Sequence, residues 1–455
     1  MKIIQTPFCF YPDPIGGTEI YVEALAKQLQ QLGDDITITA PGSRNQIYDH
    51  NSLPIHRFAL NPDATNLHFL YGEGDPIAAK NFSAIIDREK PDLVHLHAFT
   101  AGVSLRLVRA AHQRQIPVIF TYHTPTVSCQ RGTLLKNGTQ ICSGKLDLVT
   151  CTSCTLQGMG MGAPQAQLIG KLPPKIGHSL GVLGLWGGVW TALRMSELME
   201  CRQQAFYNLM SEVDHIIAVC DWVKQVLLLN QVAEDRITVL RQGLCHPVTP
   251  AHPQPSAGSF TLKLVFLGRL DPTKGVHLLI QALSQVPDLP VTLDIYGISQ
   301  ATIADPYQQQ LQTLAHQDTR IHFQSPVAST EVVQTIANYD LLAVPSQWLE
   351  TGPLVVLEAF AAGIPVIGSR LGGIAELVED GVNGILVEPT SVEAWAEKIR
   401  DLCGDRSQLT HLRSGISPPQ DMQTVAKQMR LIYQAAIAKL SYSNSTTCEV
   451  QISGF

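Results

Sequence analysis

The sequence predicts an α/β fold in which two Rossmann-like domains, each with a doubly wound parallel sheet, face one another across a cleft. The chain has 455 residues, more than one hydrophobic core usually serves. Short apolar runs typical of buried strands alternate with helical patterns in both halves. The proline-rich segment 247–258 separates the halves and has little to bury, so we interpret it as a linker.

Each half supplies its own series of strands. In the first half they are expected at 36–40, 93–97, 118–122 and 216–219, with a helical pattern at 19–32 before them. In the second half they are expected from Leu262 onward and at 291–296, 321–323, 341–344, 365–367 and 384–387. We therefore predict an N-terminal domain at 1–246 with a cysteine-rich insertion at about 125–200, and a C-terminal domain at 259–420. A helix at 421–440 is expected to cross back to the first domain, and residues 441–455 to form a loose tail.

Composition and charge exclude some classes of protein. The chain is 45% apolar and 16% charged, as in soluble α/β proteins. Its net charge is −7 and no block of Lys and Arg occurs, so nucleic acid is not an expected partner. The amino terminus reaches Pro7 before any apolar segment of useful length, so we expect no secretory signal and a cytoplasmic location. There, ten cysteines are expected to be free thiols or metal ligands rather than disulfides.

Residues 350–365 predict a helix whose first turn can bind an anion. Thr351 is expected to cap the helix and Pro353 to lie in its first turn. Gly363 and Pro365 are expected to end it, which places the helix at about 352–362. The first amides of a helix point outward with the positive end of its dipole. We therefore predict that Gly352, Pro353, Leu354 and Val355 line the substrate site and that the amides of this turn hold a phosphate.

Two carboxylates flank this helix start. Glu350 precedes it, and Glu358 lies five residues beyond Pro353, about 7 to 8 Å along the axis at 1.5 Å per residue. A ribose and a phosphate are separated by a similar length. Cations are expected nearby, because Arg269 and Lys274 follow the first strand of this half and ligands bind at the carboxyl ends of such strands. Together these residues predict a nucleotide-sugar site.

The same motifs resemble those of a known family. The Glu-x7-Glu element of residues 350–358, the Gly-Arg-Leu-x3-Lys-Gly element of residues 268–275 and the segment 381–389 are similar to the C-terminal domain of the retaining glycosyltransferases of family four, which have the GT-B fold. The resemblance implies transfer of a glycosyl group from a nucleoside diphosphate sugar to an acceptor hydroxyl, with retention of the anomeric configuration. It also implies that the leaving diphosphate accepts the acceptor's proton, so that catalysis needs no metal or other cofactor.

The resemblance also implies roles for the residues of the C-terminal half. Arg269 and Lys274 would stabilise the negative charge that develops on the diphosphate. Glu350 would hold sugar hydroxyls and Glu358 the ribose.

Three residues of the N-terminal half also match the family. Gly16 and Gly17 stand where its members keep a glycine pair between the first strand and the first helix, although a plain strand-to-helix turn is an alternative. His123 matches a histidine that faces the donor sugar; the alternative is a histidine satisfied by local backbone. We expect His95 and His97 to point to opposite faces of their strand, so that only His97 can support the site.

Four cysteines predict a structural zinc site outside this core. Cys129, Cys142, Cys151 and Cys154 fall within 26 residues and end in a Cys-x2-Cys pair. Four thiolates can enclose a tetrahedral zinc ion. Unconnected thiols and two labile disulfides are the alternatives.

The segment 176–193 has no charged residue and lies between Lys175 and Arg194. Eighteen residues are the lower limit for spanning a bilayer, and five glycines disfavour a lone transmembrane helix. Trp186 and Trp190 are four residues apart and are expected on one helical face, as interfacial anchors. We predict peripheral docking at the inner face of the membrane, with a mobile or buried helical hairpin as the alternative.

The predicted function is that of a retaining hexosyltransferase in polysaccharide, glycolipid or cell-envelope biosynthesis, with a nucleoside diphosphate sugar as donor and a saccharide or lipid-linked acceptor. The alternatives are a nucleotide-sugar epimerase or a phosphorylase of the same fold, and a non-catalytic subunit that binds nucleotide sugar or docks a partner. Two departures from the family pattern, at 242–243 and 296–299, leave the donor base and sugar open.

Overall fold

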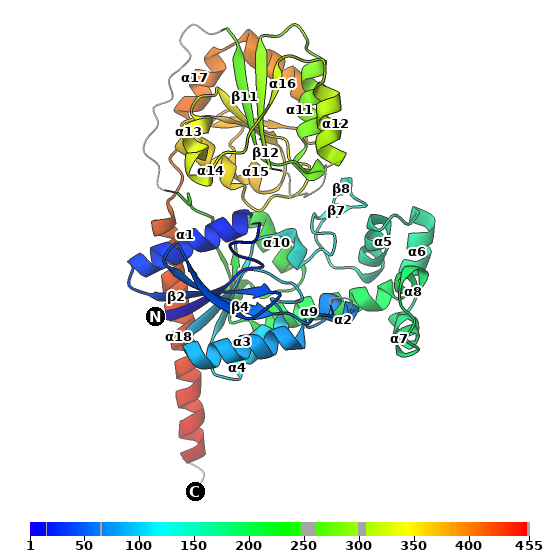
Figure 1. Cartoon of the computed structure of the whole chain (residues 1–455), viewed down its shortest axis with the longest axis vertical. Coiled ribbons are helices and arrows are strands. Elements are labelled where there is room, and N and C mark those ends of the chain that lie inside the picture. The colour runs from blue at the N-terminus through cyan, green and yellow to red at the C-terminus, as the bar shows by residue number, and fades with distance from the viewer. Residues whose placement is uncertain (15, 64–65, 247–259, 299–305, 453–455) are drawn as a thin grey trace. The chain divides into compact units, whose positions relative to one another are not determined.

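The computed structural model describes residues 1–452 except 15, 64–65, 247–259 and 299–305 (Figure 1). The predicted linker at 247–258 therefore lies outside the described residues. The chain divides into two compact units: unit 1 comprises Met1–Arg241 and Gln423–Phe455, and unit 2 comprises Gln242–Met422.

Unit 1 is built on an eight-stranded sheet in the order β10-β9-β6-β5-β1-β2-β4-β3. Neighbouring strands are parallel except β3, which pairs antiparallel with β4 at one edge. The strands are β1 (Lys2–Thr6), β2 (Asp35–Gly42), β3 (Gln46–His50), β4 (Leu53–Ala59), β5 (Leu93–Leu96), β6 (Val118–Tyr122), β9 (His215–Ala218) and β10 (Ile237–Val239). The central strands are buried throughout, because they carry apolar side chains on both faces of the sheet and helices cover it.

The helices of unit 1 include α1, which follows β1, and α9, which leads into β9. Their bounds are α1 (Gly17–Gln31), α2 (Leu67–Tyr71), α3 (Pro76–Glu89), α4 (Leu105–His112), α5 (Leu148–Gly158), α6 (Ala163–Gly170), α7 (Pro174–Val182), α8 (Gly188–Leu193), α9 (Met195–Glu212) and α10 (Asp221–Leu229). Helices α5 to α8 belong to the predicted insertion and lie to one side of the sheet (Figure 1).

Unit 2 has a six-stranded parallel sheet in the order β13-β12-β11-β14-β15-β16. This is the strand order of a dinucleotide-binding Rossmann fold. Successive strands are added toward one edge from β11 to β13 and toward the other edge from β14 to β16, so the switch point of the sheet lies between β11 and β14. The strands are β11 (Leu262–Arg269), β12 (Val291–Ile298), β13 (Ile321–Gln324), β14 (Leu341–Val344), β15 (Val366–Ser369) and β16 (Gly384–Val387). The helices are α11 (Val276–Ser284), α12 (Pro306–Ala315), α13 (Val332–Ile336), α14 (Leu354–Ala361), α15 (Gly372–Leu377), α16 (Val392–Gly404) and α17 (Ser407–Ser414).

Two apolar cores cover the two faces of this sheet. Along β11, Leu264 and Phe266 enter the core shared with α11, α12 and α16, whereas Val265 enters the core shared with α13, α14 and α15. The alternation follows from the two-residue period of a strand. Both faces are buried, so the loops at the carboxyl ends of the strands are left to bind a ligand.

The last helix, α18 (Met422–Ile452), belongs to unit 1 beyond its first residue. Tyr433 of this helix is fully buried, and its hydroxyl group accepts a hydrogen bond from Gln5 Nε2 at 3.0 Å. Arg430 forms an ion pair with Asp34 at 2.9 Å. The helix continues to Ile452 where a loose tail is expected from residue 441. No Gly or Pro occurs between 441 and 452, and extending an existing helix adds one hydrogen bond for each residue fixed.

The segment 176–193 does not form the shared helical face that was expected for Trp186 and Trp190. Its chain forms α7 and α8, separated by a turn in which Gly184 and Gly187 have φ of +70° and +82°. Trp186 lies in this turn, so Trp186 and Trp190 do not share one helical face. The alternative was a mobile or buried helical hairpin: two short helices joined by a turn are found, but the side chains of Val182 and Leu183 are 75% and 72% exposed, so the hairpin is not buried there. Within the described residues, no helix is both long and apolar enough to cross a bilayer.

Candidate active site

The loops that follow β11 and β14 meet at the switch point of the unit 2 sheet. Gly275 has φ of +73°, and a Cβ atom there would lie 2.0 Å from the carbonyl oxygen of Pro345. The amide of Gln347 donates to the carbonyl oxygen of Thr273 at 2.6 Å. A larger residue at 275 would therefore separate the loops that carry Lys274 and Glu350.

Lys274 and Glu350 form an ion pair across these loops, with Nζ 2.5 Å from Oε1. The same oxygen accepts hydrogen bonds from Ser346 Oγ at 2.8 Å and from Trp348 Nε1 at 2.9 Å. Glu350 is buried, so water does not solvate its carboxylate. The three protein donors hydrogen-bond to it instead and fix its position. The sequence predicted both charged residues but neither their pairing nor the contributions of Ser346 and Trp348.

Helix α14 begins two residues later than predicted. Its first residue is Leu354, and Pro353, rather than Thr351, is the N-cap. A residue before proline is disfavoured in helical conformation, which excludes Gly352 from the helix. The first intrahelical bond joins the amide of Val356 to the carbonyl oxygen of Pro353 at 3.0 Å. Within the described residues, the amides of Leu354 and Val355 have no acceptor.

Two glycines missed by the sequence analysis pack against this segment. Gly372 and Gly373 begin α15, and Gly372 has φ of +52°. The amide of Gly373 donates to the carbonyl oxygen of Glu350 at 2.6 Å. A Cβ atom at Gly373 would lie 2.9 Å from the backbone nitrogen of Gly352. The two glycines therefore set the backbone between Glu350 and the helix start, and their pairing in the loop after the predicted strand at 365–367 was the signal available.

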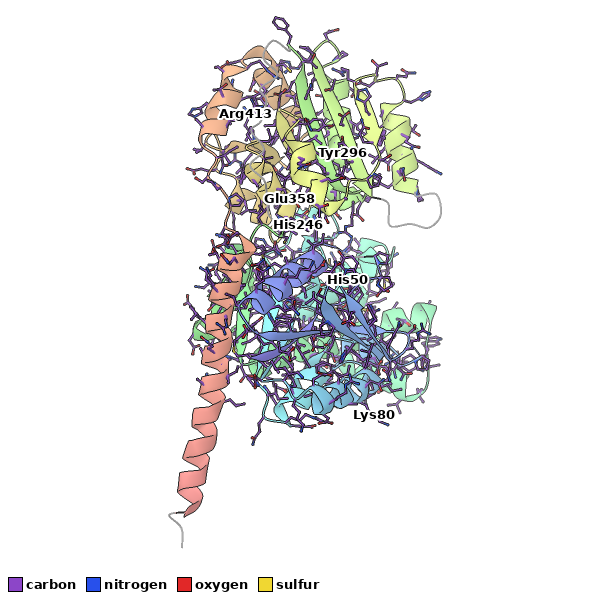
Figure 2. The ribbon with its side chains drawn as sticks, turned by 60° about the vertical axis from the view of Figure 1, so that its left-hand side comes forward. His50, Lys80, His246, Tyr296, Glu358 and Arg413 are labelled. Atoms are coloured by element: carbon purple, nitrogen blue, oxygen red, sulfur yellow. The ribbon has the colours of Figure 1, made fainter. Side chains whose placement is uncertain are left out.

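Glu358 lies on the second turn of α14 and is half-buried (Figure 2). Its carboxylate has no hydrogen-bond or ion-pair partner within the described residues, and burial raises its pKa to about 7. Gln242 is buried beside the helix start: a Cβ atom at Gly352 would lie 3.2 Å from its Oε1. Within the part of the chain that the structure describes, this Oε1 has no donor. Unit 2 thus presents two unsatisfied acceptors near the free amides of α14.

Arg269 is the last residue of β11 and is half-buried at the carboxyl end of the strand. It therefore lies at the same edge of the sheet as Lys274, which ends the 3₁₀ turn Pro272–Lys274. This is the position that the sequence predicts for both cations.

In unit 1, Gly16 and Gly17 lie at the amino end of α1. Gly16 is the N-cap, and its amide donates to Glu19 Oε2 at 2.9 Å. Glu19 is buried, and burial raises the pKa of its carboxyl group. The helix start is therefore partly satisfied by its own chain.

His123 is part of a buried polar network at the carboxyl ends of β5 and β6. Its Nε2 lies 2.9 Å from His97 Nδ1, and His97 Nε2 lies 2.6 Å from Gln5 Oε1. His95 joins the network through Tyr433, whose hydroxyl lies 2.6 Å from His95 Nδ1. The prediction that His95 and His97 point to opposite faces is wrong: their ring centroids are 3.9 Å apart, because residues two apart on a strand share a face.

Burial keeps these imidazoles uncharged. It lowers the pKa of His123 to about 3. It also lowers the pKa of His97 well below its usual value, with further contributions from His95 and His123. A neutral His123 can donate or accept a hydrogen bond but cannot serve as a cation at neutral pH.

The four predicted zinc ligands lie in the insertion, and all four line one cavity. Their sulfur atoms are not gathered at ligand distance. Within the described residues, only His68, Glu197 and Cys201 bring three potential ligand atoms within 4.8 Å of one another.

Comparisons with known proteins agree with this architecture. The family model described as glycosyl transferases group 1 matches residues 254–415, and the model described as glycosyltransferase family 4 matches residues 15–157. D-inositol 3-phosphate glycosyltransferase of Corynebacterium glutamicum is 33% identical over 197 residues, which are 41% of this chain and 46% of that protein. The chain thus matches about half the length of such curated relatives.

Solved structures show the fold. Sucrose-phosphate synthase from Thermosynechococcus elongatus superposes with a TM-score of 0.65 at 19% identity, over 96% of this chain and 100% of that one. Anabaena HepE in complex with UDP superposes with a TM-score of 0.64 at 19% identity, over 96% and 100%. The two parallel-sheet units therefore have the GT-B fold. The chain belongs to glycosyltransferase family four, which confirms the prediction from its motifs.

Proposed function

We propose that the protein transfers a glycosyl group from a nucleoside diphosphate sugar to an acceptor hydroxyl, with retention of the anomeric configuration. The observation that carries the proposal lies at the switch point of unit 2. There, the ion pair of Lys274 and Glu350 adjoins a helix start whose amides at Leu354 and Val355 have no acceptor within the described residues. A cation beside free helix amides suits a diphosphate.

In this mechanism the acceptor oxygen attacks the anomeric carbon on the face from which the diphosphate leaves. The bond from that carbon to the diphosphate oxygen breaks, and the proton of the acceptor hydroxyl passes to the leaving diphosphate. Arg269, Lys274 and the α14 amides stabilise the negative charge that develops there. The chain's other groups hold the donor: Glu350 and His123 the sugar, Glu358 the ribose.

The family membership supports this reading, as do the ligands of similar structures. Anabaena HepE is described in complex with UDP and with UDP-glucose. The proposal for this chain is a nucleoside diphosphate hexose as donor.

The acceptor is proposed to be a saccharide or lipid-linked molecule presented at the inner face of the membrane. Helices α7 and α8 support a membrane contact, because apolar side chains cover their exposed surface. These are Ile176, Val182, Leu183, Trp186, Val189 and Trp190, which we call the α7–α8 patch. No Asp or Glu occurs between Asp147 and Glu197, whereas Lys171 and Lys175 are exposed beside the patch. An apolar surface with cations and no carboxylates matches an anionic bilayer surface.

The function is tested by incubating the protein with a panel of nucleoside diphosphate hexoses, with and without saccharide and lipid-linked acceptors. We expect release of nucleoside diphosphate and a glycosidic product with the donor's anomeric configuration, measured by NMR. Glu350→Gln should remove turnover. An inverted product or an epimerised nucleotide sugar would contradict the proposal, and binding without turnover of any donor would favour a non-catalytic subunit.

A further inference from the structure

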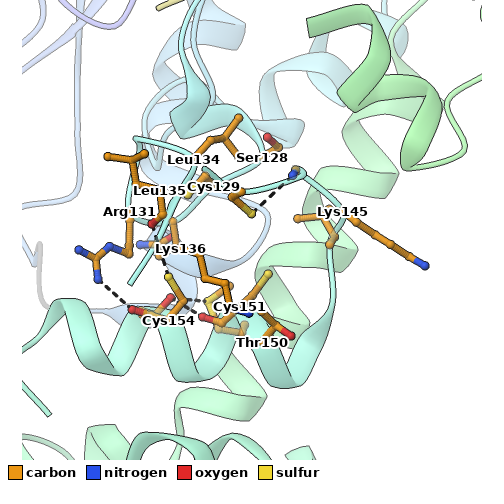
Figure 3. A pocket seen from close by; sticks show the side chains of 16 residues that line it. Ser128, Cys129, Arg131, Leu134, Leu135, Lys136, Lys145, Thr150, Cys151 and Cys154 are labelled. Atoms are coloured by element: carbon orange, nitrogen blue, oxygen red, sulfur yellow. Dashed lines mark hydrogen bonds between the residues drawn. The ribbon is translucent and has the colours of Figure 1, made fainter. Parts of the chain in front are cut away.

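The cavity that holds the four cysteines is formed by three different parts of the insertion (Figure 3). Cys129 follows the 3₁₀ turn Pro125–Val127, and Cys142 directly follows the two-stranded hairpin of β7 (Leu135–Lys136) and β8 (Gln140–Ile141). Cys151 and Cys154 lie three apart on α5 and therefore share a helical face. The cavity has a volume of about 50 Å³.

We propose that these four cysteines bind one structural zinc ion. In binding, each thiol releases its proton to solvent and each thiolate gives one bond to the metal, so that Zn²⁺ with four thiolates carries a net charge of −2.

Backbone amides already point toward two of the sulfur atoms. The amide of Asn137 lies 3.3 Å from Cys154 Sγ, and the amide of Gly144 lies 3.5 Å from Cys142 Sγ. A neutral thiol sulfur is a weak acceptor, whereas a metal-bound thiolate gains from such donors. Gly144 has φ of +80°, so the turn that aims its amide favours glycine.

The charges around the cavity have the sign that this complex needs. Arg131, Lys136 and Lys145 line it, and no Asp or Glu is among its lining residues, all of which are described. Three cations without a carboxylate suit a centre of charge −2 and would repel a bare cation bound by neutral groups.

The hairpin also needs a stabilising group. Its two strands are two residues long and Ile141 is 60% exposed, so the buried apolar surface on this side of the cavity comes from Leu134 and Leu135, which are 2% and 6% exposed. An isolated hairpin of this size is not stable on its own. A metal that joins the hairpin, the preceding loop and α5 would add covalent cross-links to the small apolar contact of these two leucines.

The sulfur atoms are spread around the cavity wall, so the proposal requires them to move inward when zinc binds. Cys129 and Cys142 lie outside regular elements, where such movement is least restricted. The rival cluster is less suitable: Arg194 donates to Glu197 at 3.1 Å and its Nη2 lies 3.3 Å from His68 Nε2. A guanidinium group in that position opposes a metal cation.

The test is elemental analysis of the full chain purified without chelator. We expect about one zinc per chain, released by a thiol-specific mercurial. Cys151→Ser and Cys142→Ser should each lose the zinc and lower the melting temperature. Cys201→Ser is the matched control, because it removes a ligand of the rival cluster and should retain the zinc.

X-ray absorption of the wild type decides the case even where the variants fail to fold. A first shell of four sulfur atoms at about 2.3 Å supports the site. A shell containing nitrogen or oxygen, zinc-free protein with four alkylatable thiols, or a mass lower by two or four hydrogens that indicates disulfides would overturn it.

Discussion

At the residue scale, Lys274 contributes both to the proposed donor site and to the folded state, because its ammonium group is the cationic partner of a buried carboxylate. We predict that Lys274→Ala weakens nucleoside diphosphate binding by about 1.5 to 3 kcal/mol, as expected for a lost charge-assisted contact. It should also destabilise unit 2, because Glu350 loses its counter-ion and remains buried. Calorimetric titration and denaturant unfolding measure the two effects.

A double variant separates these effects. Lys274→Ala with Glu350→Gln should recover much of the lost stability, because the amide needs no counter-ion, while nucleotide affinity stays low. Arg269→Ala should reduce affinity by a similar amount. If both single variants bind nucleoside diphosphate as tightly as the wild type, the two cations do not contact the diphosphate.

Glu358 gives a prediction with a defined pH dependence. Its pKa is raised from 4.5 to about 7 in the folded protein. Between these values the unfolded state loses the proton first, so the free energy of unfolding falls as pH rises and the full cost remains above pH 7. Glu358→Gln should therefore stabilise the protein at pH 8 by about 2 to 3 kcal/mol. It should weaken nucleoside diphosphate binding, because the amide accepts ribose hydroxyls less strongly than a carboxylate.

The control for this prediction is Glu397→Gln, which changes an exposed carboxylate on α16. It should leave both the stability curve against pH and the affinity unchanged. If Glu358→Gln destabilises the protein at pH 8, the predicted cost of the buried carboxylate is wrong. If it leaves nucleoside diphosphate affinity unchanged, Glu358 does not bind the ribose.

Sequence reasoning found the charged residues of the site because their spacing is local. Glu350 and Glu358 belong to one continuous segment, and Arg269 and Lys274 to another. It could not find that Lys274 faces Glu350, because that contact joins loops 76 residues apart. Gly372 and Gly373 were missed for the same reason: their requirement for glycine arises from the backbone of the Glu350 loop packed against them.

At the scale of elements, α7 and α8 carry the prediction for the membrane. The protein should co-sediment with vesicles that contain anionic lipid and much less with neutral vesicles, because the α7–α8 patch is flanked by exposed Lys171 and Lys175. Trp186→Ala with Trp190→Ala should reduce binding several-fold while hydrolysis of soluble donor is unchanged. Phe260→Ala is the control, since this aromatic side chain is 89% exposed in unit 2. Wild-type protein that stays in the supernatant with both vesicle types would refute the contact.

The elements that the sequence predicted best are those buried on both faces. Strand β14 is a continuous apolar run, and β6 and β11 are apolar over most of their length, as expected in a parallel sheet that is covered on both faces. The edge hairpin of β3 and β4 was not predicted, because β3 is largely exposed and polar and therefore lacks the apolar run. The start of α14 was predicted two residues early, since the conformational effect of Pro353 on the preceding residue outweighed the capping preference of Thr351.

At the scale of the whole molecule, the chain passes from unit 1 to unit 2 and then returns to unit 1. Unit 1 is therefore completed by residues from both ends of the chain. The sequence indicated the return of the last helix but not its anchor. The anchor is Tyr433, a side chain whose role depends on Gln5 and His95 more than 300 positions earlier, as the sequence separations of 428 and 338 residues show. A contact at such a separation leaves no local pattern to read.

We predict that Tyr433→Ala destabilises unit 1 by about 3 to 5 kcal/mol, because it opens a cavity in the core and leaves two buried polar groups without their partner. Leu431→Ala on the same helix is the matched control: its side chain is 66% exposed, and it should cost less than about 1 kcal/mol. Hydrogen exchange followed by mass spectrometry should show faster exchange in β1 and β5 of the Tyr433 variant, with β11 and β14 unchanged. Equal acceleration in both units, or equal effects of the two variants, would mean that α18 is not the element that completes the core of unit 1.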